Sequence, residues 1–159
     1  MVEFVLLGIP AMIVFTTVIT CSIDMWQFFT LSYAVNQTAR YAALHGISCT
    51  QNSNACQVTR DGIASYLQAQ AMALSAAGTT MILNDGSGDV ICNPVTACPS
   101  SISYFPSAGH NSVGTNRVTV TAKYTLTNPI FMFWPGSGTS AVTAHGFIVG
   151  ATSTQQILF

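Results

Sequence analysis

The first third of the chain is an almost uninterrupted apolar stretch. Residues 4–23 carry no charged side chain, and apolar residues continue beyond them as far as Tyr33. No glycine or proline interrupts residues 12–44, so the pattern predicts one helix over about residues 2–45, roughly 65 Å long at 1.5 Å per residue. Because about 20 apolar residues cross a bilayer core, the first half can span a membrane and the second half must serve another purpose.

A second, shorter helix is predicted at about residues 58–77. Thr59 is a suitable N-cap, and apolar side chains recur at helical spacing over residues 63–74. We expect this stripe to pack against the upper half of the first helix. The chain is therefore divided into an N-terminal transmembrane or filament-core helix, residues 1–45, and a globular head, residues 46–159.

The rest of the head predicts a small antiparallel sheet. Residues 79–92 contain two short strands around the turn residues 84–88. Residues 117–126 alternate between apolar and polar side chains, as a half-buried strand does. A returning strand is predicted at about residues 140–150; it is apolar on both faces, so we expect a neighbouring subunit to cover one of them. The predicted fold class is α+β, with a long hydrophobic helix, a second packing helix and a sheet.

Composition and charge narrow the function classes. Half of the residues are hydrophobic and 6% are charged, against about 25% charged in a typical soluble domain. Disorder needs more charge and fewer apolar residues. Four basic residues against five acidic ones cannot build a nucleic-acid-binding stripe or a charged coiled coil. A membrane-anchored or heavily self-buried protein remains, without a nucleic-acid partner.

The N-terminus lacks the basic residues that normally flank a membrane anchor. The first basic residue is Arg40, and no small-residue cleavage site closes the apolar run, so an ordinary signal peptide is not favoured. We expect instead that a basic leader has been removed before Met1. Two interpretations of Glu3 stay open. It is either solvated among lipid headgroups or paired with the terminal amine of a neighbouring copy.

Four of the five cysteines lie in polar, loop-like segments. In an oxidising compartment, the local pairs Cys49–Cys56 and Cys92–Cys98 are the simplest of three pairings. A four-cysteine zinc site is the less favoured alternative, because the spacings are wider than in the usual knuckle. Cys21 lies in the anchor and is expected to be free.

No catalytic motif is found. The three histidines are far apart in sequence, so neither an enzyme nor a metal or other cofactor is expected. The segment 85–89 has calcium-loop composition, but a hairpin turn explains it.

The aromatic residues Phe131, Phe133 and Trp134 favour a head-to-head interface, with hydrophobic core as the alternative.

Several segments of the chain resemble one family. Residues 1–10, MVEFVLLGIP, resemble the processed N-terminus of the TadE-like pseudopilins of the tight-adherence (Tad) pilus system. Asp24 falls where that family has an acidic residue, and residues 36–43, NQTARYAA, are similar to its A-R-x-x-A-R-Y-A segment. Residues 117–124 and 140–144 resemble its two C-terminal strands.

The resemblance implies a type IV pilin-like subunit. A prepilin peptidase would remove the leader, and the chain would wait in the bacterial inner membrane until the pilus assembly machinery extracts it into a cell-surface filament. The charge-poor composition favours a structural subunit forming a homopolymer; the alternative is a minor pseudopilin or a membrane-anchored assembly or tip factor. The residues expected to act in assembly lie on the N-terminal helix: Glu3, Phe4, Pro10, Trp26, Phe28, Phe29 and Tyr33.

Overall fold

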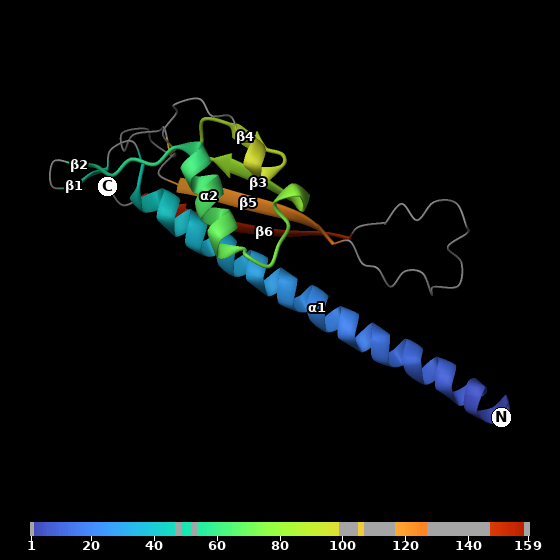
Figure 1. Ribbon diagram of the computed structural model, residues 1–159. Helices are drawn as coiled ribbons and strands as arrows, with labels where there is room; N and C mark the ends of the chain where they lie inside the picture. The colour runs from blue at the N-terminus through green and yellow to red at the C-terminus, as the bar shows by residue number, and fades with distance from the viewer. Residues whose placement is uncertain are drawn as a thin grey trace.

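The computed structural model describes residues 2–46, 49–51, 54–98, 105–106, 117–126 and 147–157. One long helix carries a compact head beside its C-terminal half, and its N-terminal half projects away from the head (Figure 1). The head consists of a second helix and an antiparallel sheet. The predicted α+β class is confirmed.

Helix α1 (Val2–Leu44) has 43 residues, close to the predicted range. It contains Pro10 in its third turn, where the proline ring has no N–H to donate to the carbonyl oxygen four residues earlier. At the other end, the His45 N–H bonds to the Ala42 carbonyl oxygen at 3.4 Å, and the His45 carbonyl accepts from the Val58 N–H at 2.9 Å. The chain therefore leaves α1 directly into contact with the segment that leads to the second helix.

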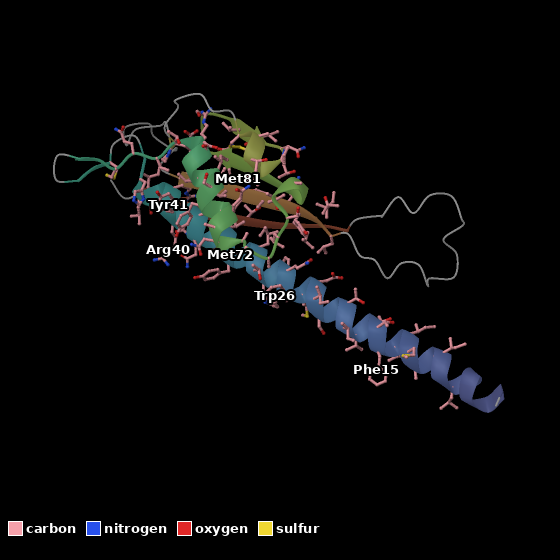
Figure 2. The ribbon with its side chains drawn as sticks, viewed as in Figure 1. Phe15, Trp26, Arg40, Tyr41, Met72 and Met81 are labelled. Atoms are coloured by element: carbon pink, nitrogen blue, oxygen red, sulfur yellow. A yellow bond between two sulfur atoms is a disulfide. The ribbon has the colours of Figure 1, made fainter. Side chains whose placement is uncertain are left out.

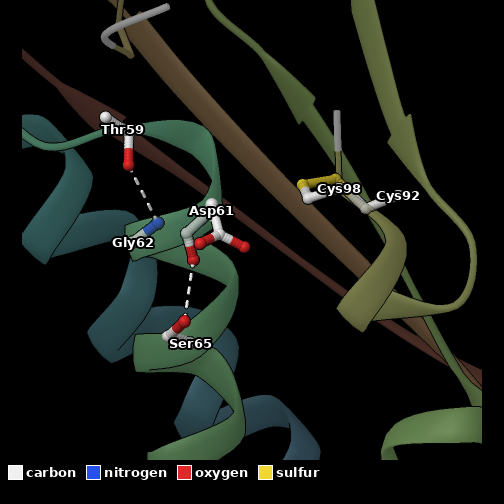
Figure 3. Close-up of a disulfide and its surroundings, with 6 residues drawn as sticks. All are labelled: Thr59, Asp61, Gly62, Ser65, Cys92 and Cys98. Atoms are coloured by element: carbon white, nitrogen blue, oxygen red, sulfur yellow. Dashed lines mark hydrogen bonds between the residues drawn. A yellow bond between two sulfur atoms is a disulfide. The ribbon is translucent and has the colours of Figure 1, made fainter. Parts of the chain in front are cut away.

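Helix α2 (Arg60–Gln70) begins as predicted, with the Thr59 hydroxyl accepting a hydrogen bond from the Gly62 N–H at 3.2 Å (Figure 3). It ends earlier than the predicted residue 77. Ala71 leaves the helical conformation, and a tight turn and the 3₁₀ helix η1 (Ala76–Gly78) follow. The prediction was too long because Leu74 still packs against the core from the turn, which continues the apolar periodicity past the helix.

The main sheet has the strand order β4-β3-β5-β6, with every neighbouring pair antiparallel. Strands β3 (Thr79–Asn84) and β4 (Asp89–Cys92) confirm the predicted hairpin, and β5 (Arg117–Leu126) has the predicted bounds. Two shorter elements were not predicted, namely the hairpin of β1 (Thr50–Gln51) with β2 (Asn54–Ala55) and the 3₁₀ helix η2 (Val95–Ala97).

The returning strand β6 (Phe147–Gln156) differs from its predicted range. It continues to residue 156 rather than 150, while residues 140–146 lie outside the described part. The register explains the difference, because β6 pairs with the whole of β5, from Leu126 opposite Phe147 to Arg117 opposite Gln156. The small and polar residues 151–156 have little apolar pattern of their own, so the partner strand decides where β6 ends.

Both helices cover one face of the sheet, α1 over β5 and β6 and α2 beside it (Figure 1). Alternate residues of β5 and β3 are buried on this face. The opposite face is lined by threonines, with hydroxyl pairs Thr119–Thr154 and Thr121–Thr152 at 3.0 Å. Ile148 on β6 is 69% exposed, so the described residues leave this apolar side chain uncovered. The largest fully buried side chains are Phe105, Leu31, Ile63, Leu67, Met81 and Leu83.

The two predicted disulfides are confirmed. Cys49–Cys56 and Cys92–Cys98 are bonded, with Cα–Cα distances of 5.4 Å and 4.4 Å. The second pair is buried and ties β4 to the segment after η2 (Figure 3). Cys21 on α1 is free and exposed. With all four head cysteines in disulfides, the zinc alternative does not hold.

Candidate functional site

The head covers only one face of the C-terminal half of α1. Residues on that face recur every three or four positions, as expected for one side of a helix. Tyr33, on the opposite side, is 57% exposed. The head therefore does not enclose α1 even where the two pack together. The buried positions of α1 are Leu31, Ala34, Val35, Thr38, Ala39, Ala42 and Ala43.

The N-terminal half of α1 is apolar on every side, and the described residues of the head do not cover it. The consecutive residues Met12, Ile13, Val14 and Phe15 are all exposed, and four consecutive residues point in all directions around a helix. A helix on the surface of a soluble protein normally keeps a polar side toward water. By length and composition, α1 can cross a membrane.

The serine and threonine hydroxyls in the first 30 residues of the chain are bonded within α1. Each of the following side chains donates to the carbonyl oxygen four residues earlier: Thr16, Thr17, Thr20, Ser22 and Thr30. Such bonds satisfy the hydroxyl without water. This matters in an apolar environment, where an unsatisfied polar group costs several kcal/mol. The hydroxyls therefore add little polarity to the surface of α1.

The aromatic residues predicted for assembly lie where the bare part of α1 meets the head. Trp26 and Phe29 are 59% and 61% exposed, and Phe28 contacts Phe29 edge-on with 5.9 Å between ring centroids. Figure 2 shows Trp26 on α1 between Phe15, on the bare part, and Tyr41, beside the head. These rings have no cover in a single chain, and their role in assembly stays a prediction.

The other predicted site residues are only partly placed. Pro10 is exposed within α1. The backbone of Glu3 and Phe4 belongs to α1, but their side chains lie outside the described part. Phe131, Phe133 and Trp134 also lie outside the described residues, so the predicted head interface cannot be located.

The calcium-like segment forms a turn. The Asn84 side-chain oxygen accepts from the Gly86 N–H at 2.7 Å, and the Asp85 carboxylate accepts from the Ser87 N–H at 3.0 Å. Gly86 and Gly88 have positive φ angles of 90° and 144°, which glycine adopts most easily. Among the described residues, no three His, Cys, Asp or Glu side chains gather in a group that could hold a metal ion.

An aromatic stack between the two helices was missed at the sequence level. The Tyr41 ring on α1 lies 4.2 Å from the Tyr66 ring on α2, with 7° between their planes, and 4.2 Å from the His45 ring. The spacing of Tyr41 and His45 gave one signal, since residues four apart meet on a helix. Tyr66 gave none, because its partner is on another element. The stack is one of the contacts between α1 and α2.

Comparison with known protein families finds no family model that matches this chain, and comparison with curated proteins and solved structures finds no match. The resemblance to TadE-like pseudopilins therefore rests on the residues of the chain alone.

Proposed function

We propose that this protein is a structural, pilin-like subunit that waits in a membrane and then assembles into an extracellular helical filament through α1. The observation that carries the proposal is the bare N-terminal half of α1, which is apolar on every side and continuous with a helix that packs on a head. Such a surface needs an apolar environment, and both lipid and a bundle of like helices supply one.

Lipid accounts for the first segment of α1. Residues 4–23 carry no charge and span about 30 Å as a helix, which matches the hydrocarbon core of a bilayer. The internally bonded hydroxyls suit this environment. Asp24 would then lie at the edge of the core on the side of the head.

Neighbouring copies account for the next segment. Trp26, Phe29 and Tyr33 lie beyond the expected bilayer exit, and each is more than half exposed. Burying one such side chain contributes roughly 1.5–3 kcal/mol, so several per subunit favour association strongly. A head on one side of a long helix suits a heterologous contact, which repeats without closing and so produces a filament.

The two disulfides support a head outside the cytoplasm, because disulfides persist in oxidising compartments. This agrees with an inner-membrane subunit whose head is already on the outer side. In this proposal a prepilin peptidase removes the leader, and the assembly machinery moves the helix from lipid into the filament.

The test introduces a charge at Phe28 in cells that carry the assembly machinery. We expect Phe28→Asp to abolish filaments in sheared fractions while the subunit accumulates in the membrane. Ala69→Glu, which adds one charge at an exposed position of α2, serves as the matched control and should polymerise normally. Normal polymerisation of Phe28→Asp would refute the filament-core role. A wild-type chain that stays in the membrane while filaments form without it would instead identify an assembly factor.

A further inference from the structure

The two disulfides of the head lie in different surroundings. Cys92 and Cys98 are 0% and 7% exposed and belong to the hydrophobic core (Figure 3). Cys49 and Cys56 are partly exposed. They flank the hairpin of β1 and β2, which forms a two-stranded sheet of its own at the C-terminal end of α1 (Figure 1). A reagent in water therefore reaches the second pair in the folded head, but it reaches the first pair only when the core opens.

The hairpin itself places Cys49 opposite Cys56. Thr50 pairs with Ala55 in the antiparallel register, so the next pair outward along the two strands is Cys49 with Cys56. Their Cα atoms are 5.4 Å apart, a separation found between paired residues on neighbouring antiparallel strands. Two thiols at these positions stay within reach of each other, so the bond can close again after it has opened.

The ends of this hairpin are also held by bonds that do not involve sulfur. The Cys49 N–H donates to the Gly46 carbonyl oxygen, and the Val58 N–H donates to the His45 carbonyl oxygen, both at 2.9 Å. Val58 is buried, which anchors the segment between the hairpin and α2 to the core. Opening the disulfide therefore leaves α1, α2 and the main sheet in contact, and it loosens only the connection between the two helices.

Thiol–disulfide exchange is a balanced reaction at this bond. A thiolate of a reduced dithiol enzyme attacks the sulfur of Cys49 or Cys56, forms a mixed disulfide and releases the other cysteine as a thiolate. The second enzyme thiol then attacks the enzyme's own sulfur in the mixed disulfide, so the enzyme is oxidised and two electrons and two protons have passed to the head. An oxidised enzyme runs the same steps in reverse and closes the bond. Because each step needs direct access to sulfur, the exposed pair reacts in the folded head and the buried pair does not.

We propose that Cys49–Cys56 is a thiol–disulfide exchange site of the folded head, which a dithiol–disulfide oxidoreductase opens or closes without unfolding the core. Cys92–Cys98 differs, because its sulfur atoms must be joined while the core is still open. The head therefore acquires the buried disulfide during folding, and the exposed one stays exchangeable afterwards. This site is independent of the role of α1 in a membrane or a filament, since it involves only the head and the end of the helix that the head covers.

The experiment follows both disulfides in the full-length chain with Cys21→Ser, which removes the free thiol. The protein is kept in a mild detergent and exposed to dithiothreitol or to reduced thioredoxin. New thiols are blocked with N-ethylmaleimide at timed intervals and located by peptide mass mapping, while near-ultraviolet circular dichroism reports whether the head stays folded. The same reduction by dithiothreitol in guanidinium chloride is the control, because unfolding exposes both pairs and their sequence separations of 7 and 6 are similar.

Without denaturant, we expect both reagents to open Cys49–Cys56 at least about a hundredfold faster than Cys92–Cys98, since the buried pair waits for the core to open. The circular dichroism should stay unchanged, and oxidised protein disulfide isomerase should close the bond again. In guanidinium chloride the two pairs should open at similar rates. Similar rates in the folded protein, or loss of the folded signal when Cys49–Cys56 opens, would overturn the inference, and so would opening by dithiothreitol but not by thioredoxin.

The variant with Cys49→Ala and Cys56→Ala gives a second measurement. We expect Cys92–Cys98 to stay closed in this variant under the same conditions, because the core does not depend on the exposed bond. Rapid opening of Cys92–Cys98 there would show that the exposed bond keeps the core shut, which contradicts exchange without unfolding.

Discussion

The two halves of α1 form one continuous helix but are stabilised in different ways. In the C-terminal half, small and branched residues such as Ala34, Val35 and Ala39 are buried against the sheet and α2. In the N-terminal half, larger apolar residues such as Phe15 and Val18 are exposed. The comparison teaches that one continuous helix serves as part of a folded core at one end and as a surface that needs a partner at the other.

Truncation should give the largest difference between the two halves of α1. We expect a chain that begins at residue 29 to give a folded, soluble and monomeric head, because every fully buried residue of α1 is retained. A chain that begins at residue 41 should lose cooperative folding, because Leu31, Val35 and Ala39 no longer cover the sheet. Size-exclusion chromatography and thermal unfolding of both chains measure this. A stable head without residues 29–40 would show that α1 is not part of the core.

Single substitutions should reproduce the contrast on a smaller scale. Leu31→Ala removes a fully buried side chain and should lower the free energy of unfolding of the head by about 2–5 kcal/mol. Phe15→Ala, at a position that is 68% exposed, should change it by less than about 0.5 kcal/mol. Denaturant unfolding in a mild detergent, followed through the head, gives both values. Equal losses would mean that the bare half also packs on the head.

The disulfides should differ because one lies in the core and the other at the edge. Removing either short cross-link should destabilise the head by roughly 2–3 kcal/mol, because the unfolded chain then gains conformational entropy. The pair Cys92→Ala and Cys98→Ala should cost more than Cys49→Ala with Cys56→Ala, because the first also leaves unfilled space among buried residues. Thermal unfolding of the two double variants compares these losses of stability. A larger loss for the variant without Cys49 and Cys56 would contradict the expectation.

The aromatic stack should give the smallest effect. Tyr66→Leu keeps an apolar side chain on α2 but removes the ring that faces Tyr41, and we expect a loss of about 1 kcal/mol in the free energy of unfolding. Tyr66→Phe keeps the ring and should be close to neutral. If the two variants behave alike, the stack contributes no more than ordinary apolar contact.

The sequence by itself determined the elements whose signals are local. The extent of α1 follows from the apolar start of the chain and from residues 12–44, which contain no glycine or proline. Strand β5 follows from its alternation, and the turn before β4 from Asn84, Gly86 and Gly88. The short disulfide loops follow from the spacing of the cysteines in polar segments. Each of these features depends on residues close together in the chain, so it can be predicted without knowing which other element packs against it.

Only the tertiary structure decided the features that depend on residues far apart. The end of β6 is set by pairing with β5, the end of α2 by a turn whose Leu74 still reaches the core, and the Tyr41–Tyr66 stack by two helices meeting. The particular residues of α1 that the head covers belong to the same class. Burial is a property of what lies opposite a side chain, and an apolar run looks the same in the sequence whether the head covers it or not.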